Sequence, residues 1–138
     1  MEIIWRPCEA HPRPEEGWGP HSDIILRGVF YAIEHGIDIF AYHELMYKAP
    51  SDENVDIESI ESVSNYVKPL TEPEKFRNAL ETGAYIADLD NSNDHAYEKS
   101  GVWVIPAFRM NGKKLDSEGG VGITKEQLAD FLRNAVQR

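Results

Sequence analysis

The chain has 138 residues, a length that suits a single domain with one core. Its 24 Asp and Glu residues outnumber its 14 Lys and Arg residues, so the net charge is −10. This charge argues against nucleic acid and anionic membrane surfaces as partners, because both are negatively charged themselves. The sequence opens without a basic leader and apolar run, and no apolar stretch approaches the roughly 20 residues of a membrane span. We therefore expect a soluble protein of the cytoplasm.

Cysteine and histidine usage limits the chemistry. Cys8 is the one cysteine of the sequence, so neither an internal disulfide nor a cysteine-based zinc site can form. The five histidines are scattered, without the His-x-x-x-His or Glu-x-x-His spacing that places two ligands on one helix face. We expect no metal and no cofactor.

The first twenty residues predict a short strand and a loop. Residues Glu2–Glu9 include Ile3, Ile4 and Trp5 before Pro7, which ends a strand or places it at a sheet edge. The stretch from His11 to Pro20 has three prolines and two glycines, a composition typical of a loop.

Between residues 21 and 100 the sequence predicts five successive helices. Apolar residues recur there at three- and four-residue spacing, and glycine or proline follows several of the segments. Asp56 is the expected cap of the third helix, and Thr71 with Glu74 forms the expected capping box of the fourth. The predicted helices are His21–His35, Asp38–Ala49, Asp56–Val67, Thr71–Leu80 and Tyr85–Ser100.

The last forty residues predict strands and a final helix. Val102–Met110 is rich in β-branched and aromatic residues, and Asn111-Gly112 is a strong hairpin signal before a return strand, Lys113–Ser117. Thr124 and Gln127 form a second capping box, which begins a helix that continues through Val136. The sequence thus predicts one α/β domain over residues 1–138, with a helical insertion at about residues 20 to 100.

Three segments resemble the DsbA-like branch of the thioredoxin fold, including FrnE-type oxidoreductases and relatives of 2-hydroxychromene-2-carboxylate isomerase. Trp5–Pro12 is similar to the family's strand and the loop into its helical subdomain, and Gly120–Leu128 to the segment leading into its last helix. Gly101–Phe108 resembles the family's GV-x-x-(V/I)-P-x-F segment, whose proline is normally cis and lies against the redox site. The resemblance implies a thioredoxin-like, DsbA-type sheet with an inserted helical subdomain.

The sequence departs from this family at its redox centre. In such domains a central strand and a helix with Cys-x-x-Cys precede the segment that begins here at Glu2. The resemblance therefore implies that the first strand and the active-site helix are missing. A sheet without its central strand exposes unpaired backbone groups, so we expect a homodimer or a companion chain to complete it.

Ile105, Pro106 and Cys8 are the candidate ligand-binding residues. The resemblance implies that a cis Pro106 turns the backbone of Ile105 outward, where it can pair with a peptide or thiol ligand. The alternative for Pro106 is a trans proline at the start of an edge strand. For Cys8 the alternative is a small, half-buried apolar group, because a redox thiol needs exposure, a nearby positive charge such as Arg6, and a resolving partner.

The functional hypothesis is a thioredoxin-like relative of the protein disulfide oxidoreductases that is inactive in thiol–disulfide exchange by itself. No residue is assigned a catalytic role. One alternative is a binding or assembly module that uses the helical subdomain and the loop at Pro106. Another is a fragment of a longer oxidoreductase, whose Cys-x-x-Cys unit lies upstream of Met1 or on a companion chain.

Overall fold

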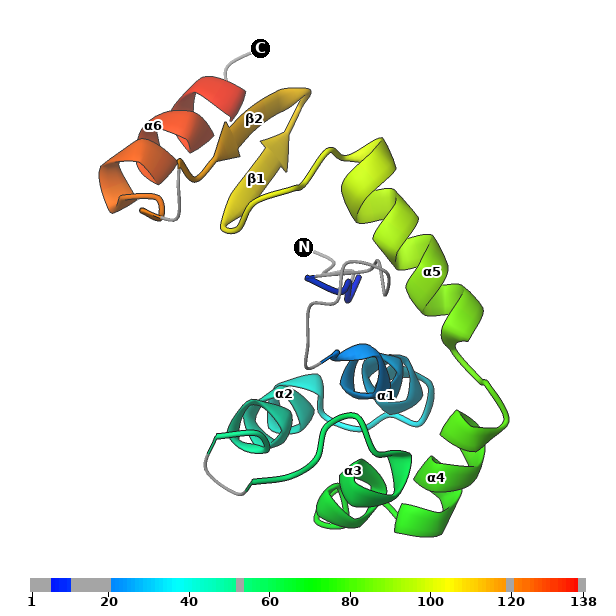
Figure 1. The fold of residues 1–138 in the computed structure, drawn as a ribbon. Helices are drawn as coiled ribbons and strands as arrows, with labels where there is room; N and C mark the ends of the chain where they lie inside the picture. The colour runs from blue at the N-terminus through cyan, green and yellow to red at the C-terminus, as the bar shows by residue number, and fades with distance from the viewer. Residues whose placement is uncertain (1–5, 11–20, 52–53, 119–120, 137–138) are drawn as a thin grey trace. The chain divides into compact units, whose positions relative to one another are not determined.

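The computed structural model describes residues 6–10, 21–51, 54–118 and 121–136 as a mixed α/β protein (Figure 1). Within these residues, six α-helices accompany one π-helical segment, η2, and a two-stranded antiparallel sheet. No helix among the described residues is long and apolar enough to cross a membrane. The elements in chain order are α1 (Asp23–Glu34), α2 (Ile39–Lys48), α3 (Ile60–Tyr66), α4 (Pro73–Glu81), α5 (Ile86–Asp94), η2 (His95–Lys99), β1 (Ala107–Met110), β2 (Lys113–Asp116) and α6 (Lys125–Val136).

The chain forms two compact units, Met1–Asn93 and Asp94–Arg138, which we call the helical unit and the hairpin unit. Helices α1 to α4 pack together in the helical unit (Figure 1). Their core contains two tyrosines and a phenylalanine beside aliphatic side chains, and its largest members are less than 2% exposed. The largest of these buried side chains are Tyr31, Tyr42, Phe76, Leu80, Val29, Val63 and Val67.

Gly28 lets α1 approach its neighbours closely. A Cβ atom at this position would lie 1.9 Å from the Tyr42 hydroxyl oxygen and 2.8 Å from Cζ of Phe76. The Tyr42 hydroxyl donates a hydrogen bond to the Ile25 carbonyl oxygen at 2.8 Å, and burial raises its pKa, so it stays a neutral donor. Glycine is therefore required by packing and not by helix propensity, which would favour alanine.

Arg27, on the same helix, closes the C-terminal end of α4. It is only 6% exposed; its Nε donates to the Ala84 carbonyl at 3.2 Å, and its Nη2 donates to the carbonyl of Leu80. The last carbonyls of a helix have no partner within the helix, so a cation that binds them also complements the helix dipole. The contact fixes α1 against the end of α4.

The hairpin unit has a sheet of two strands, covered by one helix. Strands β1 and β2 pair antiparallel with Ala107 opposite Asp116 and Met110 opposite Lys113, and α6 packs against β2 (Figure 1). Asn111 and Gly112 both have positive φ, 49° and 76°, as the tight hairpin turn predicted from this dipeptide requires. Among the described residues of this unit, Ala135 is the one buried hydrophobic residue.

The structure confirms the predicted hairpin and the second capping box. The backbone N–H of Thr124 donates to Oε1 of Gln127 at 2.8 Å, and the N–H of Gln127 donates to the Thr124 hydroxyl at 3.1 Å. These reciprocal bonds satisfy two donors at the start of α6. All five predicted helices between residues 21 and 100 are also present, with shifted ends.

Several predicted boundaries are wrong. Ser59, and not Asp56, caps α3, since the Ser59 hydroxyl accepts from the N–H of Ser62 at 3.2 Å while Asp56 accepts from Glu58 in a preceding turn. The box of Thr71 and Glu74 does not form, because α4 starts at Pro73 and its N-cap position is Glu72, which makes no side-chain cap. The Thr71 hydroxyl instead lies 3.3 Å from that of Tyr31.

Three further boundaries differ from the sequence prediction. The predicted helix at 85–100 divides into α5 and η2, and it starts after Tyr85, whose φ is 67°. Residues 6–9 of the predicted first strand are not in a strand, and its residues 2–5 lie outside the described residues. The strand predicted from Val102 begins only at Ala107.

Replacing Gly28 with Ala should destabilise the helical unit by about 1–3 kcal/mol, the usual cost of overpacking. This loss should outweigh the roughly 0.5–1 kcal/mol that alanine gains over glycine inside a helix. Chemical denaturation, followed by circular dichroism, measures the difference. In a Tyr42→Phe background the same substitution should cost less, because the nearest clashing atom is removed; equal costs in both backgrounds would refute the packing explanation.

Candidate functional site

The segment between η2 and the end of β2 holds two of the three predicted site residues, Ile105 and Pro106. It consists of a loop, residues 100–106, followed by the β1–β2 hairpin. Gly101 begins the loop with a φ of 61°, a value that glycine adopts without strain. The N–H of Val102 donates to the carbonyl of Ala96 at 2.9 Å, which ties the start of the loop to η2.

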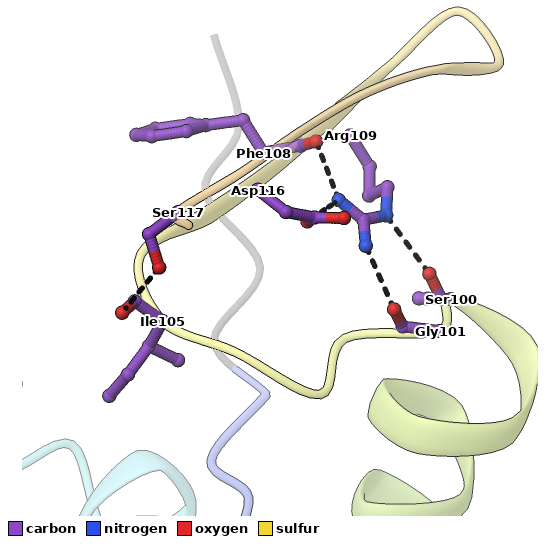
Figure 2. A network of polar contacts seen from close by, with 7 residues as sticks. All are labelled: Ser100, Gly101, Ile105, Phe108, Arg109, Asp116 and Ser117. Atoms are coloured by element: carbon purple, nitrogen blue, oxygen red, sulfur yellow. Dashed lines mark hydrogen bonds and ion pairs between the residues drawn. The ribbon is translucent and has the colours of Figure 1, made fainter. Parts of the chain in front are cut away.

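Arg109 binds the start of this loop to the hairpin. Its Nε donates to the Ser100 carbonyl at 3.0 Å, and its Nη2 donates to the Gly101 carbonyl at 2.9 Å (Figure 2). Its Nη1 donates to the Phe108 carbonyl at 2.9 Å and also pairs with the Asp116 carboxylate. One planar guanidinium thus joins three carbonyls and one carboxylate, a geometry that lysine cannot reproduce.

Ser117 fixes the other end of the loop. Its hydroxyl donates to the Ile105 carbonyl at 3.0 Å (Figure 2). Its N–H donates to the Pro106 carbonyl at 3.0 Å. Ser117 is only 5% exposed, and the Ile105–Pro106 peptide bond is cis. The backbone at Ile105 is therefore held on its carbonyl side by the residue that follows β2.

Between these two anchors the loop presents apolar side chains to solvent. Trp103 is 56% exposed, Val104 42% and Ile105 79%. The ring of Trp103 lies against that of Tyr97, with 4.7 Å between centroids and a tilt of 43°. Among the described residues, the N–H groups of Val104 and Ile105 have no backbone acceptor. The loop thus offers an exposed apolar surface together with backbone donors.

The structure joins Ile105 and Pro106 in one loop of the hairpin unit, whereas Cys8 belongs to the helical unit. Its thiol is half-buried. Burial, and then the negative charge of Glu9, raise its pKa above that of an ordinary cysteine. Glu9 itself is held by Asn93, whose Nδ2 donates to the Glu9 carboxylate at 2.8 Å. The charge that acts on the thiol is thus negative, contrary to the role considered for Arg6, and it disfavours the nucleophilic thiolate.

The sequence analysis did not single out Arg109 and Ser117. The register could have indicated Arg109, because Asp116 lies opposite Ala107 and is therefore the diagonal neighbour of Arg109 across the hairpin. Ser117 directly follows β2 and carries no comparable signal. Within the described part of the chain, no group of three His, Cys, Asp or Glu side chains is arranged to hold a metal ion.

Comparisons of the chain with protein-family models, with curated protein sequences and with solved structures found no match.

Replacing Arg109 with Lys should loosen the hairpin unit, because an ammonium group cannot reach all four acceptors. We expect a loss of about 1–3 kcal/mol, with faster amide exchange at Phe108–Met110 in hydrogen-exchange NMR. Arg133→Lys is the matched control, since Arg133 is 70% exposed and, within the described part of the chain, pairs with Asp130 and its own helix alone. Equal exchange rates in the two variants would contradict the assigned role of Arg109.

Proposed function

We propose that the chain is a thioredoxin-like relative of the DsbA family that binds an extended polypeptide at residues 103–106 and does not exchange disulfides by itself. The observation that carries the proposal is the exposed apolar run Trp103–Ile105, which is anchored at both ends by Arg109 and Ser117. The likeness of Gly101–Phe108 to the substrate-contacting loop of that family supports the same reading.

Two interactions contribute to the free energy of binding at this loop, namely apolar contact and backbone hydrogen bonds. The exposed side chains of Val104 and Ile105 provide apolar area, which contributes roughly 25 cal/mol per Å² when a partner covers it. The N–H groups of the same residues can pair with carbonyls of an extended chain, as in strand addition. Because the loop is already fixed at both ends, binding costs little ordering entropy.

A second copy of the chain is the alternative occupant of this surface. Within the described residues the sheet has two strands, so the outer edge of β1 has no strand neighbour. Isolated two-stranded sheets are marginally stable in water, and pairing β1 with a partner strand would extend the sheet. A homodimer or a companion chain is thus a second candidate for the partner.

The binding proposal predicts that S-carboxymethylated insulin B chain, an extended polypeptide without free thiols, shifts the amide signals of Val104 and Ile105 in a saturable NMR titration. Ile105→Asp should weaken this binding about tenfold or more, because covering an isoleucine contributes roughly 1.5–3 kcal/mol. Val121→Asp is the matched control, since Val121 is 89% exposed on the same unit but outside the loop.

Equal affinity for both variants would refute the assignment of the loop as the binding surface. Light scattering of the free chain separates the two kinds of partner. A monomer that binds the peptide supports polypeptide binding. The peptide proposal is overturned if the free chain is a dimer, if Ile105→Asp dissociates this dimer, and if the peptide does not shift the NMR signals of the loop. That result identifies a second copy of the chain as the occupant.

Thiol–disulfide exchange should be absent from the chain alone. With dithiothreitol present, insulin should precipitate at the rate seen without the protein, because exchange needs a resolving thiol and Cys8 has none within the chain. The raised pKa of Cys8 further reduces its thiolate fraction near pH 7. An acceleration that disappears in Cys8→Ser would contradict this part of the proposal without affecting the peptide titration.

A further inference from the structure

An open groove of about 680 Å³ lies in the helical unit, between the C-terminal end of α1 and the segment that joins α3 to α4. This volume is within the range of about 300–1,000 Å³ that is typical of small-molecule sites. Its lining residues belong to the helical unit, whereas the loop at Ile105 belongs to the hairpin unit. Its lining includes aromatic, cationic and apolar side chains in one concave surface.

Tyr31 and His35 form a rigid side of the groove. Tyr31 is 1% exposed, and Phe76 lies edge-on to its ring with 5.0 Å between centroids. The His35 ring stacks on Tyr31 with 3.9 Å between centroids and an interplanar angle of 16°. Nδ1 of His35 lies 2.9 Å from the Tyr31 carbonyl oxygen. Because a carbonyl can only accept, Nδ1 carries the hydrogen in this contact.

Two polar groups of the groove lining are available to a ligand. The second ring nitrogen of His35, Nε2, has no hydrogen-bond partner among the described residues, and neither has the ammonium group of Lys68. Lys75 also lines the groove, but it is paired with Glu72 at 2.9 Å. The ammonium group of Lys68 can donate to an anion. Nε2 of His35 can also donate to it in the imidazolium form of the ring, which carries a hydrogen on both nitrogens.

Four further residues of the lining are apolar. Ile37 and Leu70 are half-buried, and both pack against the core of the unit. Pro69 and Pro73 complete this wall with rigid rings. A ligand with an apolar body could therefore cover this wall while its charged end reaches the basic groups.

The charge of the groove contrasts with that of the unit around it. Residues 1–93 contain eighteen acidic and seven basic side chains. The groove lining, in contrast, includes two lysines and a histidine with a single acid, Glu72. A local excess of basic groups in an acidic unit favours an anion at this position over other parts of the same surface.

We propose that this groove binds a small organic anion whose apolar body packs against Ile37 and Leu70 and whose carboxylate or phosphate contacts Lys68 and His35. The charged end supplies acceptors for the Lys68 ammonium group and for the Nε2–H of the imidazolium form of His35, through charge-assisted hydrogen bonds. The apolar body gains affinity from the surface it covers.

Octanoate is the probe for the test, with 1-octanol and inorganic phosphate as its apolar and anionic halves. Octanoate should cause saturable amide shifts at Leu70 and Thr71 in the 138-residue chain, and Lys68→Met should weaken its binding about tenfold or more. Lys48→Met is the matched control, because Lys48 is an exposed lysine of α2 paired with Glu44. His35→Phe, which can keep the ring stack but lacks Nε2, should also weaken binding.

Several outcomes would overturn the proposal. Binding of 1-octanol as tight as that of octanoate would show that the groove does not recognise charge. Phosphate binding as tight as octanoate binding would refute the role of the apolar wall. Equal octanoate affinity for Lys68→Met and Lys48→Met, or the absence of saturable shifts at Leu70 and Thr71, would refute the site itself. If octyl phosphate binds more tightly than octanoate, the head group is a phosphate, and the reverse order identifies a carboxylate.

Discussion

The uneven burial of apolar side chains governs how each unit is held together. The helical unit buries large side chains such as Tyr31, Tyr42 and Phe76, whereas in the hairpin unit Ala135 is the one buried hydrophobic residue among those described. Burying a large apolar side chain contributes roughly 1.5–3 kcal/mol, and a hydrogen bond to a charged group contributes about as much. Arg109, with four acceptors, therefore contributes to the hairpin unit about as much as one large buried side chain contributes to the helical unit.

This difference explains why the candidate binding loop can be both exposed and ordered. Apolar side chains are usually fixed in place by burial. For an exposed run such as Trp103–Ile105, the entropic cost of fixing the backbone would ordinarily exceed the free energy gained from contacts. Here polar anchors on the two flanks, Arg109 and Ser117, fix the backbone without covering the side chains. The apolar surface thus stays accessible, and binding does not have to order it.

Local chemistry determined how much of the fold could be predicted from the sequence. The helices follow from apolar spacing, and the box of Thr124 and Gln127 forms because each side chain bonds the other's backbone. The similar box at Thr71 does not form, because α4 begins one residue later with Glu72 at its N-cap, and the Thr71 hydroxyl lies beside that of Tyr31, forty residues earlier in the chain. Gly28 is a further case, because the packed position of Tyr42 leaves no room for a side chain there. Sequence patterns cannot reveal such contacts, because they depend on which helices pack together.

The same distinction separates the two candidate sites. Ile105 and Pro106 were found through a contiguous motif, and Arg109 could have been added from the hairpin register. The groove unites His35 at the end of α1 with Lys68 after α3, and no sequence spacing connects them. The net charge of the unit does not indicate this basic lining either, because the unit as a whole has an excess of acidic residues. A net charge of −10 argues against large polyanions, whereas a small anion responds to the few groups that it touches.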